Sequence, residues 1–237
     1  MPRGRIRASD GMADPHCVQK AAGAVDRWHV GQRISPGLGV AMSAALCLSR
    51  RFIARPLRSR TLATMRRINV VGTSCSGKTT LARAVAERLD LPHIEMDSRF
   101  WGPGWTPVPP ELFRARVEDA AAGDGWVLDG GYSPVRDVIW SRADTVVWLD
   151  YPMPTVLGRW AMRTVARTRR GDEFWPGTGN RESVRNAFRR DGLLAWILTT
   201  HRRRRRTMAA QLAACPEIGA VRLRSQREAD RWLRELA

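Results

Sequence analysis

A buried strand that runs into a glycine-rich loop and then into a helix is the feature that most constrains this chain. The loop has the pattern G-x-x-x-x-G-K-T between Gly72 and Thr79, and apolar residues at helical spacing follow it from Leu81 to Leu89. Gly72 and Gly77 allow the backbone to fold around an anion, and the N–H groups of such a loop and of a helix N-terminus point toward phosphate oxygens. The stretch therefore predicts a nucleoside triphosphate site.

Each position of this loop has an expected contact. We expect ATP to be bound by Gly72, Thr73, Ser74, Cys75, Ser76, Gly77, Lys78, Thr79 and Thr80. Lys78 would reach the outer phosphates, and the Thr79 hydroxyl would hold Mg²⁺. Of forty basic residues only Lys20 and Lys78 are lysines, and a compact ammonium fits beside phosphate where a planar guanidinium fits badly.

Cys75 lies inside the loop and close to the helix N-terminus, an environment that lowers the pKa of a thiol. We therefore predict a reactive cysteine that ATP protects. The alternative is an inert small residue that fits the loop.

From Ile68 onward, apolar segments typical of strands alternate with helical segments. Strands are predicted at 68–71, 93–96, 126–129, 145–150 and 218–223. Helices are predicted from the loop to about residue 90, from Pro109-Pro110, over 155–170, over about 182–212, and after Ser225, which has capping-box spacing to Glu228. Near-continuous apolar strands separated by helices indicate a parallel sheet covered on both faces, an α/β fold.

Two carboxylates end predicted strands and compete for the magnesium role. Asp129 and Asp150 each follow an apolar run, and ligands bind at the carboxyl ends of strands in open parallel sheets. We favour Asp129 as the metal residue because Gly130-Gly131 leaves backbone room for a ligand. The alternative for either residue is a cap on the helix that follows.

Asp97 follows the second predicted strand and faces the same crevice. It is expected to orient a substrate hydroxyl or act as its base, with an ordinary Asx-turn as the alternative. The loop that contains Trp101 and Trp105 would stack on a ring or close over a substrate, or else simply pack onto the core.

Arginines dominate the region from about 159 to 182, which we predict to be a lid. Arg159, Arg163, Arg167 and Arg170 fall along one helical stripe before a Gly-rich loop. Mobile lids deliver cations to the charge that develops in phosphoryl transfer. For the run Arg202–Arg206 a solvated helix face is favoured, because five consecutive side chains point all round a helix, although contact with nucleic acid is possible.

The first 64 residues differ in composition from the rest. They contain eleven basic residues against three acidic ones and show no sustained period. We interpret residues 1–64 as a disordered basic extension or a mis-assigned gene start at which Met65 is the natural initiator, followed by a folded domain over 65–237. The net charge of +17 attracts anions of every kind. No apolar run reaches about 18 residues, so we expect no membrane span. The cysteines lie far apart and form no C-x-x-C pair, which indicates a reducing compartment, and we therefore expect a cytoplasmic protein.

Taken together, these segments resemble the nucleoside and nucleotide kinase branch of the P-loop proteins. The likeness is greatest to the adenylate-kinase-like proteins often labelled DNA topology modulation proteins. It is carried by G-T-S-C-S-G-K-T at 72–79, the 97–105 segment, W-V-L-D-G-G-Y at 126–132 with Arg136 following, A-D-T-V-V-W-L-D at 143–150, and the Arg-rich lid.

This resemblance implies a P-loop NTPase three-layer α/β/α sandwich with a five-stranded parallel sheet and a helical Arg-rich lid. It also implies an adenine contact near Arg224. Adenylate kinases end the third strand in D-G-F-P-R, and Gly131-Tyr132-Ser133 departs from that pattern. The departure puts a nucleoside monophosphate acceptor in doubt.

The sequence therefore predicts an ATP-dependent kinase that uses Mg²⁺ and a small-molecule acceptor. The residues expected to serve the transfer are Lys78, Asp97, Arg136, Arg163, Arg167 and Arg170, with Thr79 and Asp129 at the metal. The alternative is a nucleotide-dependent regulator associated with nucleic acid. Neither the acceptor nor the oligomeric state is predicted.

Overall fold

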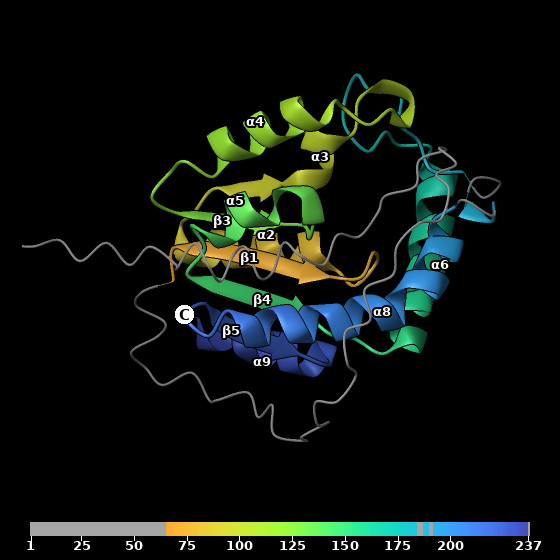
Figure 1. Ribbon diagram of the computed structural model, residues 1–237. Coiled ribbons are helices and arrows are strands. Elements are labelled where there is room, and N and C mark those ends of the chain that lie inside the picture. Colours follow the sequence, from red (N-terminus) through yellow and green to blue (C-terminus); the bar gives the residue numbers. More distant parts are fainter. Residues whose placement is uncertain (1–64, 184–186, 190–191, 237) are drawn as a thin grey trace, which may run out of the picture.

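Five parallel strands form the central sheet, in the order β2-β3-β1-β4-β5 (Figure 1). Their bounds are β1 Arg67–Gly72, β2 His93–Glu95, β3 Trp126–Asp129, β4 Thr145–Leu149 and β5 Gly219–Leu223. The computed structural model describes residues 65–183, 187–189 and 192–236, so the extension predicted over 1–64 lies outside the described residues. The predicted α/β fold with a five-stranded parallel sheet is confirmed.

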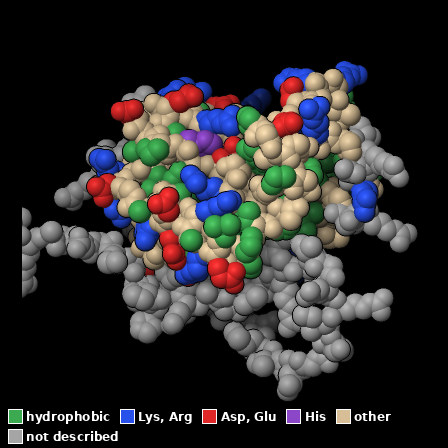
Figure 2. Space-filling model, turned by 90° about the horizontal axis from the view of Figure 1, so that it is seen from above, with side chains coloured by type: hydrophobic (Ala, Val, Ile, Leu, Met, Phe, Trp, Pro, Cys, Tyr) green, Lys and Arg blue, Asp and Glu red, His purple; other side chains and the backbone are tan. Residues whose placement is uncertain are grey.

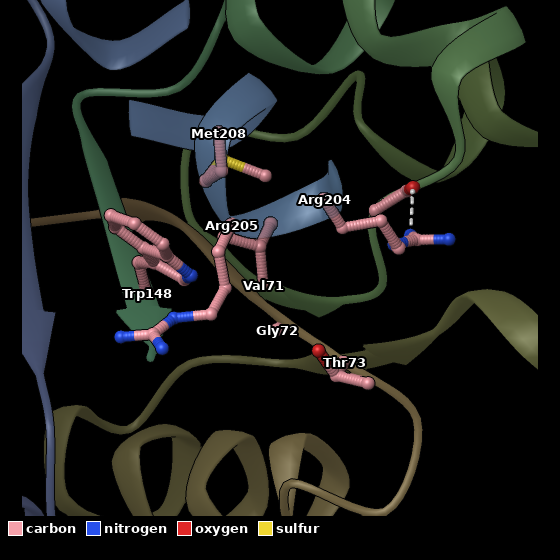
Figure 3. Close-up of a pocket in the computed structure, with 8 residues that line it drawn as sticks. Val71, Gly72, Thr73, Trp148, Arg204, Arg205 and Met208 are labelled. Atoms are coloured by element: carbon pink, nitrogen blue, oxygen red, sulfur yellow. Dashed lines mark hydrogen bonds between the residues drawn. The ribbon is translucent and has the colours of Figure 1, made fainter. Parts of the chain in front are cut away.

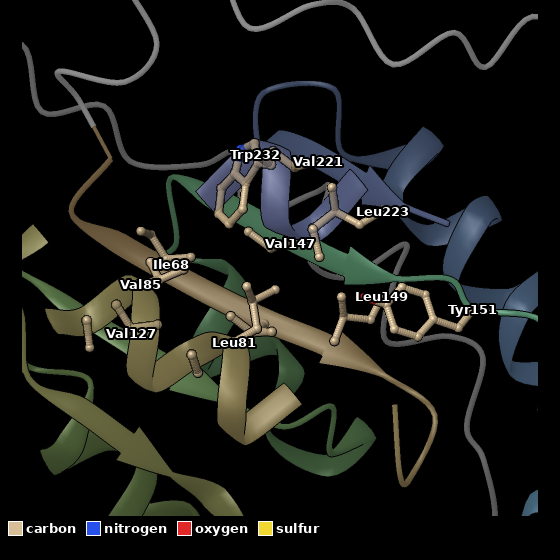
Figure 4. Packing of buried hydrophobic residues seen from close by; sticks show 14 of the residues in the cluster. Ile68, Leu81, Val85, Val127, Val147, Leu149, Tyr151, Val221, Leu223 and Trp232 are labelled. Carbon is tan, nitrogen blue, oxygen red and sulfur yellow. The ribbon is translucent and has the colours of Figure 1, made fainter. Parts of the chain in front are cut away.

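One face of the sheet is covered by α2 (Lys78–Leu89) and α9 (Gln226–Glu235). Alternate residues of β1, Ile68 and Val70, belong to the apolar cluster on this face. Leu81 and Val85 of α2 and Trp232 of α9 belong to the same cluster (Figure 4). The predicted cap of α9 is confirmed, because the Ser225 hydroxyl accepts a hydrogen bond from the Glu228 backbone N–H at 3.2 Å. This layer fixes the helix that follows the phosphate loop.

The opposite face is covered by α4 (Pro110–Ala120), α5 (Arg136–Trp140) and α8 (Leu193–Ala214). Asn69 of β1 lies buried on this side and joins neighbouring strands. Its Nδ2 donates to the carbonyls of Leu128 and Gly130 at 3.2 and 3.0 Å, and Trp140 Nε1 donates to its Oδ1 at 3.1 Å. These bonds hold the carboxyl ends of β1 and β3 side by side.

Several helical segments differ from the sequence predictions. The structure adds α3 (Met96–Phe100) directly after β2, and short 3₁₀ turns η2 (Pro103–Trp105) and η3 (Ser133–Val135). A helix was predicted from about residue 182 to 212, but the long helix α8 begins only at Leu193, because Gly192 before it has an extended backbone. Helix α6 (Met153–Arg170) agrees with the prediction and rises from the sheet at one side of the molecule (Figure 1).

The surface seen from above carries basic and acidic side chains interspersed with apolar ones among the described residues (Figure 2). None of the described helices combines the length and the apolar character that crossing a membrane requires.

Candidate phosphate-binding site

The loop between β1 and α2 is held by two glycines that no larger residue can replace without displacement. A Cβ on Gly72 would lie 2.9 Å from the backbone oxygen of Leu149, and Gly77 has a positive φ of 93°. Gly77 also faces Arg159, whose Nη1 would lie 2.9 Å from an added Cβ. The tight loop predicted from sequence therefore requires glycine at both positions, for steric reasons at Gly72 and for steric and backbone reasons at Gly77.

Lys78 opens α2 and lies inside the loop. Its Nζ donates to the Thr73 carbonyl at 3.3 Å. Burial lowers the pKa of Lys78, while the carboxylates of Asp97 and Asp129 act in the opposite direction. Ser76 is fully buried, and its Oγ has no hydrogen-bond partner among the described residues. An ammonium and a hydroxyl of this kind fit an oxyanion such as phosphate.

Asp129 ends β3 beside the loop, in register with Val70 of β1. It is 3 % exposed. Burial raises its pKa, but the neighbouring His93 and Thr79 side chains and the charge of Lys78 outweigh burial and hold the pKa below its ordinary value. The His93 Nε2 lies 3.7 Å from Asp129 Oδ2. Asp129 is therefore an ionised carboxylate next to the threonine predicted to hold a metal.

Asp150, the other strand-end carboxylate, has a different environment. Its side chain is fully buried and is bound by two guanidiniums, those of Arg205 from α8 and Arg222 from β5. Arg205 Nη2 donates to Oδ2 at 3.0 Å, and Arg222 Nε donates to the same oxygen at 2.8 Å. Two cations already neutralise this carboxylate, which leaves it ill suited to a metal.

Asp150→Asn is expected to lower the free energy of unfolding by about 3 kcal/mol, because it leaves two guanidiniums without their anion. Urea denaturation measures the change. The exposed carboxylate of Glu87 on α2 provides the control, since Glu87→Gln removes the same charge and is expected to change stability by less than about 0.5 kcal/mol. Equal stability of the two variants would contradict a structural role for Asp150.

Asp97 lies in the first turn of α3, across the loop from α2. Tyr132, which follows β3, donates its hydroxyl to Asp97 Oδ1 at 2.5 Å. Burial and the charge of Asp97 strongly raise the pKa of Tyr132, so the phenol stays protonated and donates. This contact fixes one oxygen of Asp97 and leaves the other to accept from a ligand.

The arginines of α6 form a ladder that rises from the loop. Arg159 donates to the Ser76 carbonyl and to Gln226 Oε1 at the start of α9, and its guanidinium lies 4.7 Å from the Tyr151 ring centroid. Arg163 lies 3.4 Å from Glu182. Arg167 lies 3.7 Å from the ring centroid of Phe174. The predicted stripe is present at these three positions, whereas Arg170 is exposed at the helix end.

The segment after α6 is joined to the loop around η2 by what we call the latch, formed by Asn180 and Thr178. The Asn180 side chain accepts from the Trp105 N–H at 2.7 Å and donates to the Gly102 carbonyl at 2.9 Å. The Gly104 N–H donates to the Thr178 carbonyl at 3.3 Å. Asn180 is fully buried. The two segments also lie side by side in Figure 1.

Helix α8 supplies part of the other wall of the loop. His201 Nδ1 and the Thr73 hydroxyl share a hydrogen bond of 3.0 Å, and Arg204 donates to the Gly131 carbonyl at 3.3 Å. A pocket of about 20 Å³, enough for a water molecule, separates α8 from the strand ends (Figure 3). It is lined by Val71, Gly72, Thr73, Gly131, Trp148, Arg204, Arg205 and Met208.

For three predicted site residues, Cys75, Arg136 and Arg224, the structure contradicts or does not test the predicted property. Burial raises the pKa of the Cys75 thiol more than the charges of Arg163 and Lys78 lower it, so the predicted lowered pKa is wrong. Arg136 is 8 % exposed, with its guanidinium 5.6 Å from the Trp140 ring centroid. Arg224 is exposed, and its backbone N–H donates to Glu228. The roles assigned to Arg136 and Arg224 stay predictions.

Some contacts of this site were missed from sequence. Arg159 belonged to the predicted stripe but was not assigned to the loop, although its spacing of four from Arg163 is a usable signal. His201 and Asn180 had no local signal, because their partners lie 128 and 75 residues away.

Comparison with known proteins gives limited likeness. No family model matches the chain, so the resemblance to topology modulation proteins stays a prediction. The uncharacterized protein YqaC of Bacillus subtilis (strain 168) is 29 % identical over 102 residues, which are 42 % of this chain and 57 % of YqaC. The matched part thus spans little more than half the length of that relative.

Among solved structures, the shikimate kinase of Aquifex aeolicus vf5 aligns with a TM-score of 0.44 and 15 % identity, over 72 % of this chain and 92 % of that one. The Acinetobacter baumannii shikimate kinase in complex with shikimate aligns with a TM-score of 0.41 and 17 % identity, over 76 % of this chain and 94 % of that one. The gluconokinase of Sinorhizobium meliloti 1021 aligns with a TM-score of 0.39 and 18 % identity, over 73 % of this chain and 93 % of that one.

Proposed function

We propose that this protein transfers the γ-phosphoryl group of ATP to a hydroxyl of a small-molecule acceptor. The observation that carries the proposal is the convergence of three groups on Lys78. The phosphate loop surrounds it, the carboxylates of Asp97 in α3 and Asp129 at the end of β3 act on it, and the arginine ladder of α6 approaches the same loop. Phosphoryl transfer requires this combination of positioning and positive charge.

The donor side fits a nucleotide with Mg²⁺. Ser76 Oγ is buried without a hydrogen-bond partner in the described part of the chain, and the Thr79 hydroxyl lies at the low-pKa carboxylate of Asp129. Thr79 would ligate the cation, and Asp129 would hold one of its waters. When bound, Mg²⁺ supplies positive charge to the phosphates. Lys78 would contact the outer phosphates from within the loop.

The acceptor side is organised by Asp97. Tyr132 fixes one carboxylate oxygen at 2.5 Å, so the other is free to accept the proton of an acceptor hydroxyl. As the bond between the γ-phosphorus and the ADP oxygen breaks, a new bond forms from that phosphorus to the acceptor oxygen. The hydroxyl proton passes to Asp97, and ADP leaves with the electron pair of the broken bond.

The lid supplies the remaining charge. The guanidiniums of Arg163 and Arg167 act on the Cys75 thiol in the loop, so their field reaches the phosphate position. Glu182, whose side chain is 10 % exposed, lies 3.4 Å from Arg163 and keeps it oriented. These two arginines would stabilise the charge that develops on the transferred group.

An ADP-release assay tests the proposal directly, with ATP, Mg²⁺ and panels of nucleosides, nucleoside monophosphates, sugars and sugar acids. We expect slow ATP hydrolysis alone and at least tenfold stimulation by one acceptor class, with the phosphorylated acceptor found by mass spectrometry. Failure of every acceptor to raise ADP release, or ADP release without a phosphorylated product, would contradict a kinase.

Asn180→Ala should loosen the latch, because it removes two hydrogen bonds between the lid segment and the η2 loop. Two such bonds are worth roughly 1–3 kcal/mol, so we expect acceptor-free ATP hydrolysis to rise about tenfold relative to transfer. The ratio of ADP to phosphorylated acceptor measures this. Asn180→Asp keeps the oxygen that accepts from the Trp105 backbone N–H, so its ratio of ADP to phosphorylated acceptor should lie between those of the unmodified protein and Asn180→Ala. An unchanged ratio in Asn180→Ala would show that the latch does not exclude water.

Nucleic-acid binding through the run Arg202–Arg206 receives no support as the main activity. Arg205 is bound to Asp150 and Arg204 to the Gly131 carbonyl, so two of the five guanidiniums serve the fold and the loop.

A further inference from the structure

We propose that His201 of α8 is a positioning residue for the phosphate loop, and that it acts through the Thr73 hydroxyl to hold the loop in the shape that binds ATP. The inference rests on the kinase function proposed above, because it concerns the donor side of the same site. It gives a role to the arginine-rich helix α8, to which the proposed transfer assigns no residue.

One face of α8 is bound to the ends of three neighbouring strands. His201, Arg204 and Arg205 have the spacing i, i+3 and i+4, which brings their side chains together on a helix. Arg204 donates to a backbone carbonyl just after β3 at 3.3 Å, and Arg205 donates to the carboxylate just after β4 at 3.0 Å. Strand β1 lies between β3 and β4. The two arginines therefore anchor α8 on both sides of β1, and in the view of Figure 3 their guanidiniums lie on opposite sides of Gly72. His201 meets the loop between these anchors.

Thr73 is the residue through which this contact can control the shape of the loop. Its carbonyl accepts the Ser76 backbone N–H at 3.1 Å, which closes the turn, and it also accepts Lys78 Nζ at 3.3 Å. Its hydroxyl shares the 3.0 Å hydrogen bond with His201 Nδ1. Thr73 is buried. A displacement of Thr73 would therefore disturb the turn and the position of the lysine together.

The imidazole of His201 is buried, and its polarity is hard to explain by stability. Nδ1 is bonded to Thr73, whereas Nε2 has no hydrogen-bond partner in the described part of the chain. Burial lowers the pKa of His201, and the charges of Arg205 and Arg202 lower it further against the effect of Asp150, so the ring is neutral near neutral pH. A buried polar atom without a partner costs free energy that an apolar side chain would not. Such a cost is typical of functional positions, which favours a role at the loop.

A loop that is already in its binding shape loses less free energy to ordering when the nucleotide arrives. Without the bond to His201 the loop would populate other shapes, and the affinity for ATP would fall with the fraction of molecules in the competent shape. His201 should therefore change nucleotide affinity and leave the chemical step almost unchanged. Lys78 differs in this respect, because its ammonium acts on the charge that develops during transfer.

Calorimetric titration of the full chain with AMP-PNP and Mg²⁺ measures this affinity without turnover. His201→Leu keeps the bulk and removes both ring nitrogens, so we expect Kd to rise about tenfold. His201→Asn places a polar atom at the position of Nδ1 and should stay within about threefold of the unmodified protein. Leu198→Ala, an exposed position of α8, is the control and should leave Kd unchanged. An unchanged Kd in His201→Leu that is folded by circular dichroism would overturn the inference.

Thr73→Val removes the same hydrogen bond from the other partner, and it decides the question if His201→Leu does not fold. We expect its Kd also to rise about tenfold, whereas Thr73→Ser keeps the hydroxyl and should bind normally. The double variant His201→Leu/Thr73→Val should bind no more weakly than either single variant, because both remove one and the same bond. Losses that multiply in the double variant, or a folded Thr73→Val with unchanged Kd, would contradict the positioning role.

Turnover separates this inference from the proposed function. Acceptor-stimulated transfer in which His201→Leu raises KM for ATP about tenfold at nearly constant kcat supports both. AMP-PNP affinity that depends on His201, in a protein that forms no phosphorylated product, would overturn the kinase and leave the positioning role standing. Transfer with a KM for ATP that does not depend on His201 would keep the kinase and overturn the positioning role.

Discussion

Lys78→Ala is expected to abolish ATP-dependent transfer, with kcat lowered by roughly 10²- to 10³-fold, because a charged donor is removed from the developing phosphate charge. Lys78 lies in the loop with its Nζ 3.3 Å from the Thr73 carbonyl, and the arginines around the loop, such as Arg159 of α6 and Arg204 of α8, are already bonded to backbone carbonyls. No neighbouring side chain can therefore take its place at the base of the loop. Initial rates at saturating ATP and acceptor measure the loss.

The chain offers two informative controls for this variant. Lys20→Ala removes the other lysine of the sequence and should leave the rate unchanged. Lys78→Arg keeps the charge but places a planar guanidinium in a half-buried position inside the loop, so we expect it to restore less than a tenth of the activity. Thermal unfolding shows whether either Lys78 variant still folds. A folded Lys78→Ala protein with normal transfer would exclude the loop as the donor site.

The fold was predictable because its signals are local. Each apolar strand and the turn that follows it can be recognised within ten residues, as in β1 and its loop, and the capping residue Ser225 lies three positions before its partner. The short helix α3 was missed for the same reason. Its five residues follow β2 without a turn, and their helical conformation depends on packing against α4 rather than on a pattern of their own.

The site was predictable only where a residue type carries its own chemistry. The loop, Asp97, Asp129 and the α6 arginines belong to that group, and the structure brings them together. The sequence did not predict whether a candidate side chain is already bound to another side chain of the fold. Asp150 has the same strand-end position as Asp129, and only the folded chain shows that guanidiniums from 55 and 72 residues away neutralise it. The predicted lowering of the Cys75 pKa was wrong for a related reason, because the burial that raises this pKa depends on residues distant in sequence.

Asp129→Asn is the variant that separates these two carboxylates in function. Asparagine keeps the shape and removes the charge, so we expect the Mg²⁺ concentration for half-maximal activity to rise by about 10- to 100-fold, as for other residues that orient a metal ligand. Asp129 has its pKa held low by His93, Thr79 and Lys78 against the effect of burial, so it remains ionised near neutral pH. Rates measured as a function of Mg²⁺ at fixed ATP give the shift.

The opposite behaviour is expected of Asp150→Asn, which should lower stability and leave the Mg²⁺ dependence of the folded fraction unchanged. Asp150 is bound by Arg205 and Arg222, and a carboxylate with two guanidinium partners has little affinity left for a cation. If Asp150→Asn moved the Mg²⁺ dependence and Asp129→Asn did not, the metal would lie on the β4 side of the loop. Thr79 would then be its sole ligand from the predicted pair, and the arginine pair at Asp150 would have to open whenever Mg²⁺ binds.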